Sequence, residues 1–303
     1  NVDLTSSHEK VHRFECVTLL GTRFSVEARA FVLALGGVEN ARLLLASNAQ
    51  LPDGVANSSG NVGCYFMEHP HYKGVSVWVL SRPTDLSFYK LHEIDLPQGR
   101  VRVQGVLTLA QDVLEGEGLV DFTASVSEAA IVPGDTGPID AEQVRSLIRD
   151  RDAERVYQLY VRAEQRPFRD SRVTLRTGDK DSLGMPRVDL NWRLHPDDNR
   201  GMRRALELVG AELAAAGLGR LWTSTQGDEL SWVTNPGGHH MGTARMSEDP
   251  KEGVVDKHCR CHDVENLYVA GSAVFATGAA SNPTLTIVAL AERLAQHLGE
   301  ELR

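Results

Sequence analysis

The chain lacks the features that mark nucleic-acid binders and membrane-spanning proteins. Its 303 residues carry 41 acidic and 32 basic side chains, for a formal net charge of −9. No short segment concentrates Lys and Arg as a binder of phosphate backbones does. No apolar run reaches the roughly 18 residues that a transmembrane helix needs. The sequence therefore predicts no nucleic-acid partner and no membrane span.

Cysteine is also scarce, with only Cys16, Cys64, Cys259 and Cys261 present. Four cysteines in a chain of this length do not make a disulfide framework, and Cys259 and Cys261 are too close for an unstrained bridge. A reducing compartment is favoured, and we expect a cytoplasmic location. Asn1 is not followed by the charged and apolar regions of a signal peptide, so we expect any targeting peptide to have been removed or to lie outside this sequence.

The first part of the chain has an α/β pattern. Two β-rich runs at 14–20 and 24–35 surround a turn at Gly21-Thr22, and the apolar strand at 30–34 ends at Gly36-Gly37. Leucines at helical spacing follow over 38–47. Glycines between a strand and a helix either make a tight turn or let the backbone approach a dinucleotide, and the pattern leaves both interpretations open.

The middle of the chain changes to short β-rich runs. These lie at 75–80, 101–107, 120–125 and 156–161, with a helix expected at 141–151 and a hairpin over 172–192. We expect one mostly antiparallel sheet, followed by a long helix over 196–216 that stops at Gly217. A glycine-rich segment and an apolar strand at 266–271 then return to the α/β pattern. The predicted fold class is therefore α/β with an α+β insertion.

Asn282 and Pro283 form a predicted helix start, because Asn is a favoured N-cap and Pro suits the first helical position. Apolar residues follow at helical spacing and predict a buried stripe, formed by Leu285, Val288, Ala289 and Leu294. The helix start is either ordinary structure or a site where free backbone N–H groups face a developing negative charge. The motif alone does not decide between them.

His239 and His240 lie among Gly237, Gly238 and Gly242, where the backbone can approach a ligand closely. Imidazole titrates near the pH at which a general base works. Either histidine is thus a candidate base, and the alternative is a histidine that holds a neighbouring carbonyl in place. His69 is a further residue that we expect near the cleft.

A metal site is a competing interpretation. His258, Cys259, Cys261 and His262, together with the pair at 69 and 71, supply nitrogen and sulfur ligands. A single residue between two cysteines sends their side chains to opposite sides of an extended chain, whereas zinc sites commonly separate them by about two to four residues. The spacing therefore argues against a metal, and we predict none.

Several segments together resemble the glucose–methanol–choline (GMC) flavin oxidoreductases, and especially the branch of pyranose oxidase and sugar dehydrogenases. The six segments that carry the resemblance, in chain order, are VLALGGVENARLLL at 32–45, GNVGCYFMEHP at 60–70, HHMGTARM at 239–246, GVVD at 253–256, NLYVAGS at 266–272 and NPTLT at 282–286. Each motif is weak by itself, but six in the same order are specific. Cys64 and Ala276 depart from the residues common in the family, Arg and Pro.

The resemblance implies FAD-dependent oxidation of an alcohol, a sugar or a glycoside hydroxyl to a carbonyl. His239 would be the catalytic base, Asn282 would hold the substrate oxygen, and hydride would pass to flavin N5. His240 would assist or substitute for the base. The chemistry agrees, because hydride leaves a carbon readily only as its oxygen gains negative character.

The resemblance also implies a domain layout and a cofactor site. Residues 1–68 and 232–303 would belong to a Rossmann-like FAD-binding domain, and 69–231 would be the inserted substrate domain. The implied cofactor contacts are Val2, Gly36, Gly271, Ser272, Asn282, Pro283 and Thr284. The electron acceptor, whether oxygen, a quinone or another carrier, is left open.

The family's G-x-G-x-x-G turn, which holds the FAD pyrophosphate, does not occur in this sequence. We therefore expect a missing N-terminal FAD-binding segment or a separate subunit to complete the site. Two other functions stay open at this point. One is a non-catalytic partner that kept the fold, and the other is a metal-dependent hydrolase built on the histidine and cysteine clusters.

Overall fold

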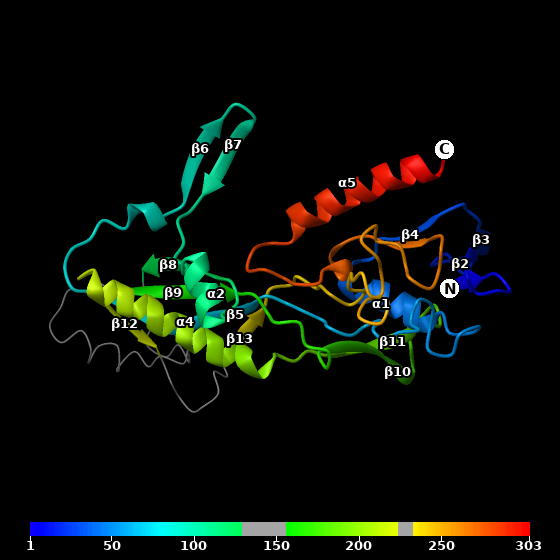
Figure 1. The fold of residues 1–303 in the computed structure, drawn as a ribbon, viewed down its shortest axis with the longest axis horizontal. Helices are drawn as coiled ribbons and strands as arrows, with labels where there is room; N and C mark the ends of the chain where they lie inside the picture. The colour runs from blue at the N-terminus through cyan, green and yellow to red at the C-terminus, as the bar shows by residue number, and fades with distance from the viewer. Residues whose placement is uncertain (129–155, 224–232) are drawn as a thin grey trace.

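Two hydrophobic cores organise the chain. The computed structural model describes residues 1–128, 156–223 and 233–303. Residues from both ends of the chain build the first core, and residues between Tyr72 and Leu213 build the second. The two parts lie next to each other along the longest axis of the molecule (Figure 1). The helix expected at 141–151 lies outside the described residues.

The N-terminal segment forms a small antiparallel sheet. Its strands are β1 (Val2–Leu4), β2 (Val11–Val17) and β3 (Arg23–Val26), in that order. The hairpin predicted around Gly21 is confirmed, since β2 and β3 pair from Phe14↔Val26 to Val17↔Arg23. The buried strand β4 (Phe31–Leu33) and the helix α1 (Gly36–Ala46) follow, so the predicted strand, glycine turn and helix are also present.

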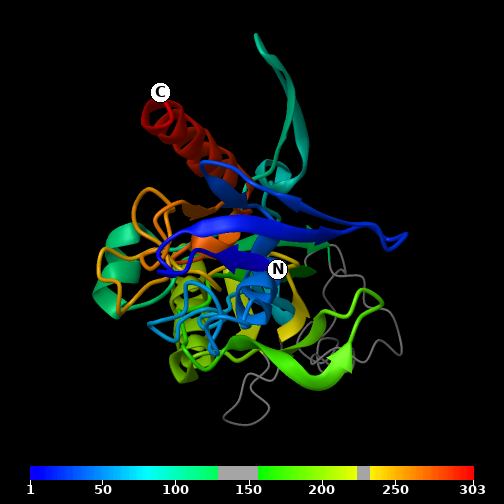
Figure 2. The same cartoon turned by 90° about the vertical axis from the view of Figure 1, so that its right-hand side faces the viewer.

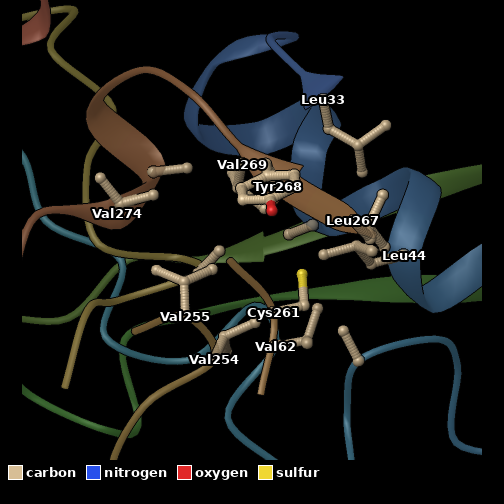
Figure 3. Packing of buried hydrophobic residues seen from close by; sticks show 14 of the residues in the cluster. Leu33, Leu44, Val62, Val254, Val255, Cys261, Leu267, Tyr268, Val269 and Val274 are labelled. Carbon is tan, nitrogen blue, oxygen red and sulfur yellow. The ribbon is translucent and has the colours of Figure 1, made fainter. Parts of the chain in front are cut away.

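Strand β14 (Leu267–Val269) pairs with β4 in parallel, from Leu267↔Phe31 to Val269↔Leu33. Both strands are apolar and pack into the first core with α1 and the segment at 254–261 (Figure 3). Each strand is followed by a glycine with positive φ, Gly36 at +85° and Gly271 at +99°, a conformation that other residues rarely adopt. The short helix η3 (Ser272–Val274) begins directly after the second glycine. The pairing of β4 with β14 brings the two glycines, which are far apart in the sequence, to the same edge of this two-stranded sheet.

The second core lies under a five-stranded antiparallel sheet. Its order is β12 (Gly219–Thr223), β5 (Pro70–Leu80), β9 (Val156–Ala163) and β8 (Phe122–Glu128), with β13 (Val233–Pro236) also paired to β5. Helix α4 (Pro196–Ala215) packs along this sheet (Figure 1). The chain enters the sheet at β5 directly after His69 and leaves it at β13 directly before the histidine loop.

Helix α4 follows from its sequence. His195 is the N-cap and accepts the N–H of Asp197, while the side chain of Asp198 accepts the N–H of His195. Pro196 occupies the first helical position, where its missing N–H costs nothing. The apolar face is buried, as its spacing predicts, through Met202, Ala205, Leu206, Val209 and Leu213. Gly217, with φ of +67°, ends the helix as predicted.

The prediction of one middle sheet is wrong in its extent. Strands β10 (Arg172–Lys180) and β11 (Pro186–Asn191) form the expected hairpin, but it packs against α1 and the first core. Strands β6 (His92–Leu96) and β7 (Gly99–Val103) form another separate hairpin, which projects from the molecule (Figure 2). The turn η1 (Ser87–Tyr89) and the helix α2 (Gln111–Glu117) precede and follow it, and neither was predicted. Hydrophobic alternation identified the strands but not their neighbours.

The last helix, α5 (Thr284–Glu301), corrects two predictions. Its N-cap is Pro283, so Asn282 stands one residue before the cap and makes no capping bond. Leu294 is buried, but Leu285 is 82% exposed and Val288 57% exposed. The apolar stripe is present, but no described residue covers the part of it formed by Leu285 and Val288. Helix α5 lies on the same side of the molecule as the β6–β7 hairpin (Figures 1 and 2). None of the described helices is long and apolar enough to cross a membrane.

Candidate active site

Two backbone hydrogen bonds hold the histidine loop against the segment that enters the sheet. Met67 N donates to Met241 O and Met241 N donates to Met67 O, each at 3.0 Å. This bridge sets Glu68 and His69 beside His239 and His240. Gly237 makes the approach possible, because a Cβ atom there would lie 3.2 Å from the Cβ of His69.

His69 contacts His239 directly. The two Nδ1 atoms are 2.9 Å apart, and the rings meet edge to face with centroids 4.9 Å apart. The other nitrogen of His69, Nε2, lies 3.2 Å from the carbonyl oxygen of Gly278. His69 is 1% exposed, and burial lowers the pKa of its imidazole. Three segments of chain therefore meet at this ring.

Glu68 is a buried carboxylate, 2% exposed, that contacts both histidines of the loop. Its Oε2 accepts the backbone N–H of His239 at 2.8 Å, and its Oε1 lies 3.1 Å from Nε2 of His240. Burial raises the pKa of this carboxyl, but the hydrogen bonds from His240 and His239 outweigh burial and the net pKa is lowered. The hydrogen bond to Glu68 raises the pKa of His240. His240 is therefore protonated more readily than an ordinary histidine, and less of it is in the neutral form that can accept a proton.

The backbone of His240 joins this cluster to the glycine turns. Ser272 Oγ donates to the carbonyl oxygen of His240 at 2.7 Å, and Thr243 Oγ1 donates to the carbonyl of Gly37. A Cβ atom on Gly37 would lie 2.5 Å from the same oxygen of His240. The ends of β4 and β14 thus lie beside the histidine loop. The structure places Ser272, and the residues next to Gly36 and Gly271, against the backbone of His240, the residue after His239.

The segment around Asn282 approaches the cluster through its backbone. Gly278 O contacts His69, and Ala279 N donates to Glu164 Oε1 at 3.1 Å. Asn282 itself is exposed, and its carboxamide has no hydrogen-bond partner among the described residues. Pro283 is buried and Thr284 exposed. The role of these three residues stays a prediction.

Val2 lies in β1, where its side chain packs into the first core. Its N–H donates to Ser47 Oγ at 3.0 Å, at the end of α1. This contact belongs to the packing of β1 on α1 and does not involve the histidine cluster. The adenine contact implied for Val2 therefore stays a prediction.

One face of the five-stranded sheet is polar next to the histidine cluster. Along β9, Leu159, Val161 and Ala163 point into the second core, so Tyr160 and Arg162 lie on the opposite face. Tyr160 Oη is 2.6 Å from Nδ1 of His71, and the Arg162 guanidinium lies 4.8 Å from the centre of the Tyr160 ring. Hydroxyl, imidazole and guanidinium groups suit the recognition of a polar ligand.

The cysteine and histidine cluster at 258–262 is part of the first core. All four cysteines are free, and Cys259 and Cys261 are buried. Burial raises the pKa of both thiols, which disfavours the thiolate that binds metals. His258 stacks on His297 of α5. Within 1–128, 156–223 and 233–303, no group of three His, Cys, Asp or Glu side chains is arranged to hold a metal ion.

Sequence reasoning missed two members of the cluster. Glu68 stands inside a motif quoted for the resemblance, and a carboxylate directly before a histidine is a signal that could have identified it. Glu164 directly follows β9 in a region with no motif, and only the fold brings it to Ala279. His69 was expected near the cleft, and the structure places it in contact with His239.

The chain is similar in sequence to several known proteins. This chain is 31% identical to 2-methyl-1,2-propanediol dehydrogenase of Mycolicibacterium austroafricanum over 296 residues, which cover 93% of this chain and 50% of the relative. It is 29% identical to the fructose dehydrogenase large subunit of Gluconobacter japonicus, over 92% of this chain and 48% of that protein. A C-glycoside 3-oxidase of Arthrobacter globiformis is 36% identical over 137 residues, 44% of this chain and 25% of the relative. The chain spans about half the length of the first two relatives.

Solved structures show the same fold. Pyridoxine 4-oxidase from Mesorbium loti matches with a TM-score of 0.60 at 18% identity, over 99% of this chain and 56% of that chain. A formate oxidase from Aspergillus oryzae, studied for modification of its FAD, matches with a TM-score of 0.60 at 16% identity, over 99% and 59%. These relatives and neighbours are oxidases and dehydrogenases, and residues 167–291 match the family GMC oxidoreductase. This match is to the C-terminal part of the GMC oxidoreductases.

FAD is the cofactor that this family indicates, and the residues at the glycine turns fit it. Space is open beside both Gly36 and Gly271, since a Cβ atom on either glycine would meet nothing within 4 Å. Both follow the carboxyl ends of parallel strands, the edge at which α/β folds bind nucleotides. Gly36, Gly271 and Ser272 are the residues of this chain that would hold the cofactor there.

Proposed function

We propose that this chain is the part of an FAD-dependent oxidoreductase that binds an alcohol and removes its hydroxyl proton. The substrate class is an alcohol, a sugar or a glycoside hydroxyl, and the product is the carbonyl. The observation that carries the proposal is the position of His239, which Glu68 and His69 hold in a loop whose next residue, His240, contacts Gly37 and Ser272. The relatives' names, a diol dehydrogenase, a fructose dehydrogenase and a glycoside oxidase, support the substrate class.

His239 is the base in this proposal, and His240 is not. A base must be neutral before it accepts a proton, and the contact with Glu68 raises the pKa of His240. His240 in its protonated form instead adds positive charge next to the loop, where oxyanion character develops on the substrate. Bound FAD would accept the hydride from the carbinol carbon, and an external acceptor would take the electrons from it.

The polar face of the sheet would bind the rest of the substrate. Tyr160, Arg162 and His71 lie on this face, and Glu164 next to it holds the backbone of the segment at 279. Such a surface suits a molecule with several hydroxyl groups, because each hydroxyl needs a donor or acceptor when it leaves water. A polyol, sugar or glycoside therefore fits better than a simple alkanol. The Asn282 carboxamide would hold the reacting oxygen.

A second polypeptide segment or subunit would complete the FAD site. Three exposed apolar side chains support this part of the proposal, Leu285 and Val288 on α5 and Leu35 before Gly36. Exposed apolar side chains that lie together, as Leu285 and Val288 do one turn apart on α5, commonly mark an interface. The chain combined with the complementary half should retain FAD through gel filtration, whereas the chain by itself should lose it. Retention of one FAD per chain without the other half would contradict this.

The test of the activity is flavin bleaching in the assembled protein. Wild type, His239→Ala and His12→Ala would be mixed under anaerobic conditions with a panel of polyols, sugars and glycosides, and the visible flavin absorbance would be followed. His12 is an exposed histidine on β2 and serves as the control. Removal of a general base should slow bleaching by roughly 10²- to 10⁴-fold. Equal rates for His239→Ala and wild type would overturn the proposal.

A further inference from the structure

The contacts of His69 allow its protons to be assigned. The carbonyl oxygen of Gly278 can only accept a hydrogen bond, so Nε2 of His69 must carry the proton that is shared with it. Burial lowers the pKa of this imidazole, which therefore carries one proton in total. Its Nδ1 is then a lone-pair acceptor. Because the two Nδ1 atoms are 2.9 Å apart, the proton between them belongs to His239.

The same reasoning assigns the other nitrogen of His239. A neutral imidazole with its proton on Nδ1 has a free lone pair on Nε2. We propose that His69 is a positioning residue that keeps His239 in this tautomer, so that Nε2 is the atom that accepts the substrate proton. This inference deepens the proposed function and depends on it for the identity of the base. His69 itself touches neither substrate nor cofactor in this assignment.

Two neighbouring residues hold His239 at two points. Glu68 accepts its backbone N–H at 2.8 Å and His69 accepts its ring N–H at 2.9 Å. The bridge between Met67 and Met241 sets the register of both contacts. The ring therefore has one orientation as well as one tautomer, and a base held in this way needs no rearrangement before it reacts.

The assignment also covers the step after proton transfer. When Nε2 of His239 accepts the proton, the imidazolium still donates its Nδ1 proton to His69, because that nitrogen is a donor in both forms. No hydrogen bond has to break. The charged and ionisable groups around His69 are His239, Glu68, Glu164 and His71. Glu68 and Glu164 raise the pKa of the His69 imidazole, but burial outweighs them and the net pKa is lowered.

The experiment reads the tautomer directly. The holoenzyme would be prepared with ¹⁵N-labelled histidine, and two-bond ¹H–¹⁵N spectra would be recorded above the titration range of the imidazoles. The signals of His239 would be identified by their loss in His239→Gln. We expect the Nδ1–H form in wild type and a loss of that preference in His69→Leu. An Nε2–H form of His239 in wild type, or an unchanged tautomer in His69→Leu, would overturn the assignment.

Two further variants separate positioning from folding. His69→Asn places a carboxamide oxygen near the position of Nδ1, so it should restore the tautomer and most of the turnover. His69→Leu should lower kcat by roughly 10- to 100-fold, as removal of an orienting partner commonly does. His262→Leu is the matched control, because Nε2 of this partly buried histidine also contacts a carbonyl, Ser247 O at 3.1 Å, away from the cluster. It should leave the His239 signals unchanged.

The outcomes distinguish this inference from the proposed function. If His239→Gln keeps full turnover, His239 is not the base and the proposed function is wrong. The wild-type spectrum still shows which tautomer His239 adopts. If His69→Leu does not fold, wild type and His69→Asn carry the test. An Asn variant that folds, shows the Nδ1–H form and remains as slow as a base deletion would also overturn the role of His69, because the tautomer would then not limit turnover.

Discussion

A single methyl group at Gly37 should displace the histidine loop that carries the candidate base. Gly37 lies in the first turn of α1, and the nearest atoms to a Cβ there belong to His240, the carbonyl oxygen at 2.5 Å, the carbonyl carbon at 2.7 Å and Cβ at 2.8 Å. Two of these are backbone atoms, so no side-chain rotation relieves the clash. Gly37→Ala must therefore move the histidine loop or the start of α1.

The size of the movement follows from the contact distances. Ordinary van der Waals contact begins at 3.4 Å, so the carbonyl oxygen of His240 must retreat by about 0.9 Å, the difference from 2.5 Å. The same oxygen accepts the 2.7 Å hydrogen bond from Ser272, which would be stretched. Overpacking of this kind costs roughly 1–3 kcal/mol of unfolding free energy. A misplacement of about 1 Å in an active site costs roughly 10²-fold in turnover.

The assay measures stability and turnover in the assembled holoenzyme. Chemical denaturation gives the unfolding free energy, and the rate of flavin bleaching gives the turnover. Gly116→Ala on α2 is the matched control, because its Cβ would meet nothing within 4 Å and its φ is ordinary. The control should be neutral or stabilised by up to about 1 kcal/mol. A Gly37→Ala protein with wild-type stability and turnover would refute the reasoning about this contact.

Three further predictions concern charge. Burial raises the pKa of Asp198 to about 6, so the folded state binds this proton more tightly than the unfolded state and stability falls as pH rises between 3.8 and about 6. Asp198→Asn should therefore gain up to about 3 kcal/mol relative to wild type between about pH 4 and pH 7, measured by urea titration at both; a pH-independent difference would contradict this. Glu68→Gln removes the partner that raises the pKa of His240, and that contribution is present below the unfolded pKa and lost as pH rises through the folded pKa. Because the His240 side chain is 45% exposed, we expect the variant to lose only about 1 kcal/mol near pH 6 and less near pH 9; a larger loss at the higher pH would disprove the pairing. Arg42→Lys should cost roughly 1–3 kcal/mol, because this 14% exposed guanidinium donates to Asp181 at 2.6 Å and to Pro186 O at 2.7 Å. The measurement is the change in thermal unfolding temperature, with Arg176→Lys as the control because the Arg176 side chain is 52% exposed. Equal changes for the two variants would refute the prediction.

Local patterns predicted much of the secondary structure. The start and the end of α4, the strand, glycine turn and helix at 31–46, and the hairpin over 172–191 all depend on contacts between residues near in sequence. Helical hydrogen bonds and turn conformations have this short range, so residue order is sufficient to indicate them. The apolar stripe of α5 was also correct as a pattern. Its burial was not, because periodicity indicates a face and not its partner.

The candidate site was predictable only in part. The glycine-rich loop identified His239 and His240, and the resemblance added the residues at the glycine turns. Glu164 carries no motif, and the contact of His240 with Gly37 joins segments that no spacing rule connects. Whether Asn282 faces the reacting oxygen was left to the resemblance, and its exposed carboxamide leaves that role a prediction.

The order of residues by itself determined the helices, the turns and the chemical types available to the site, because these follow from interactions within a few positions of the chain. The tertiary structure alone decided that β4 pairs in parallel with β14 and that His69 holds His239 from 170 positions away. Such contacts must offset the entropy of closing long loops, and only the burial of the whole core offsets it. The tautomer of the candidate base therefore follows from the fold and not from its motif.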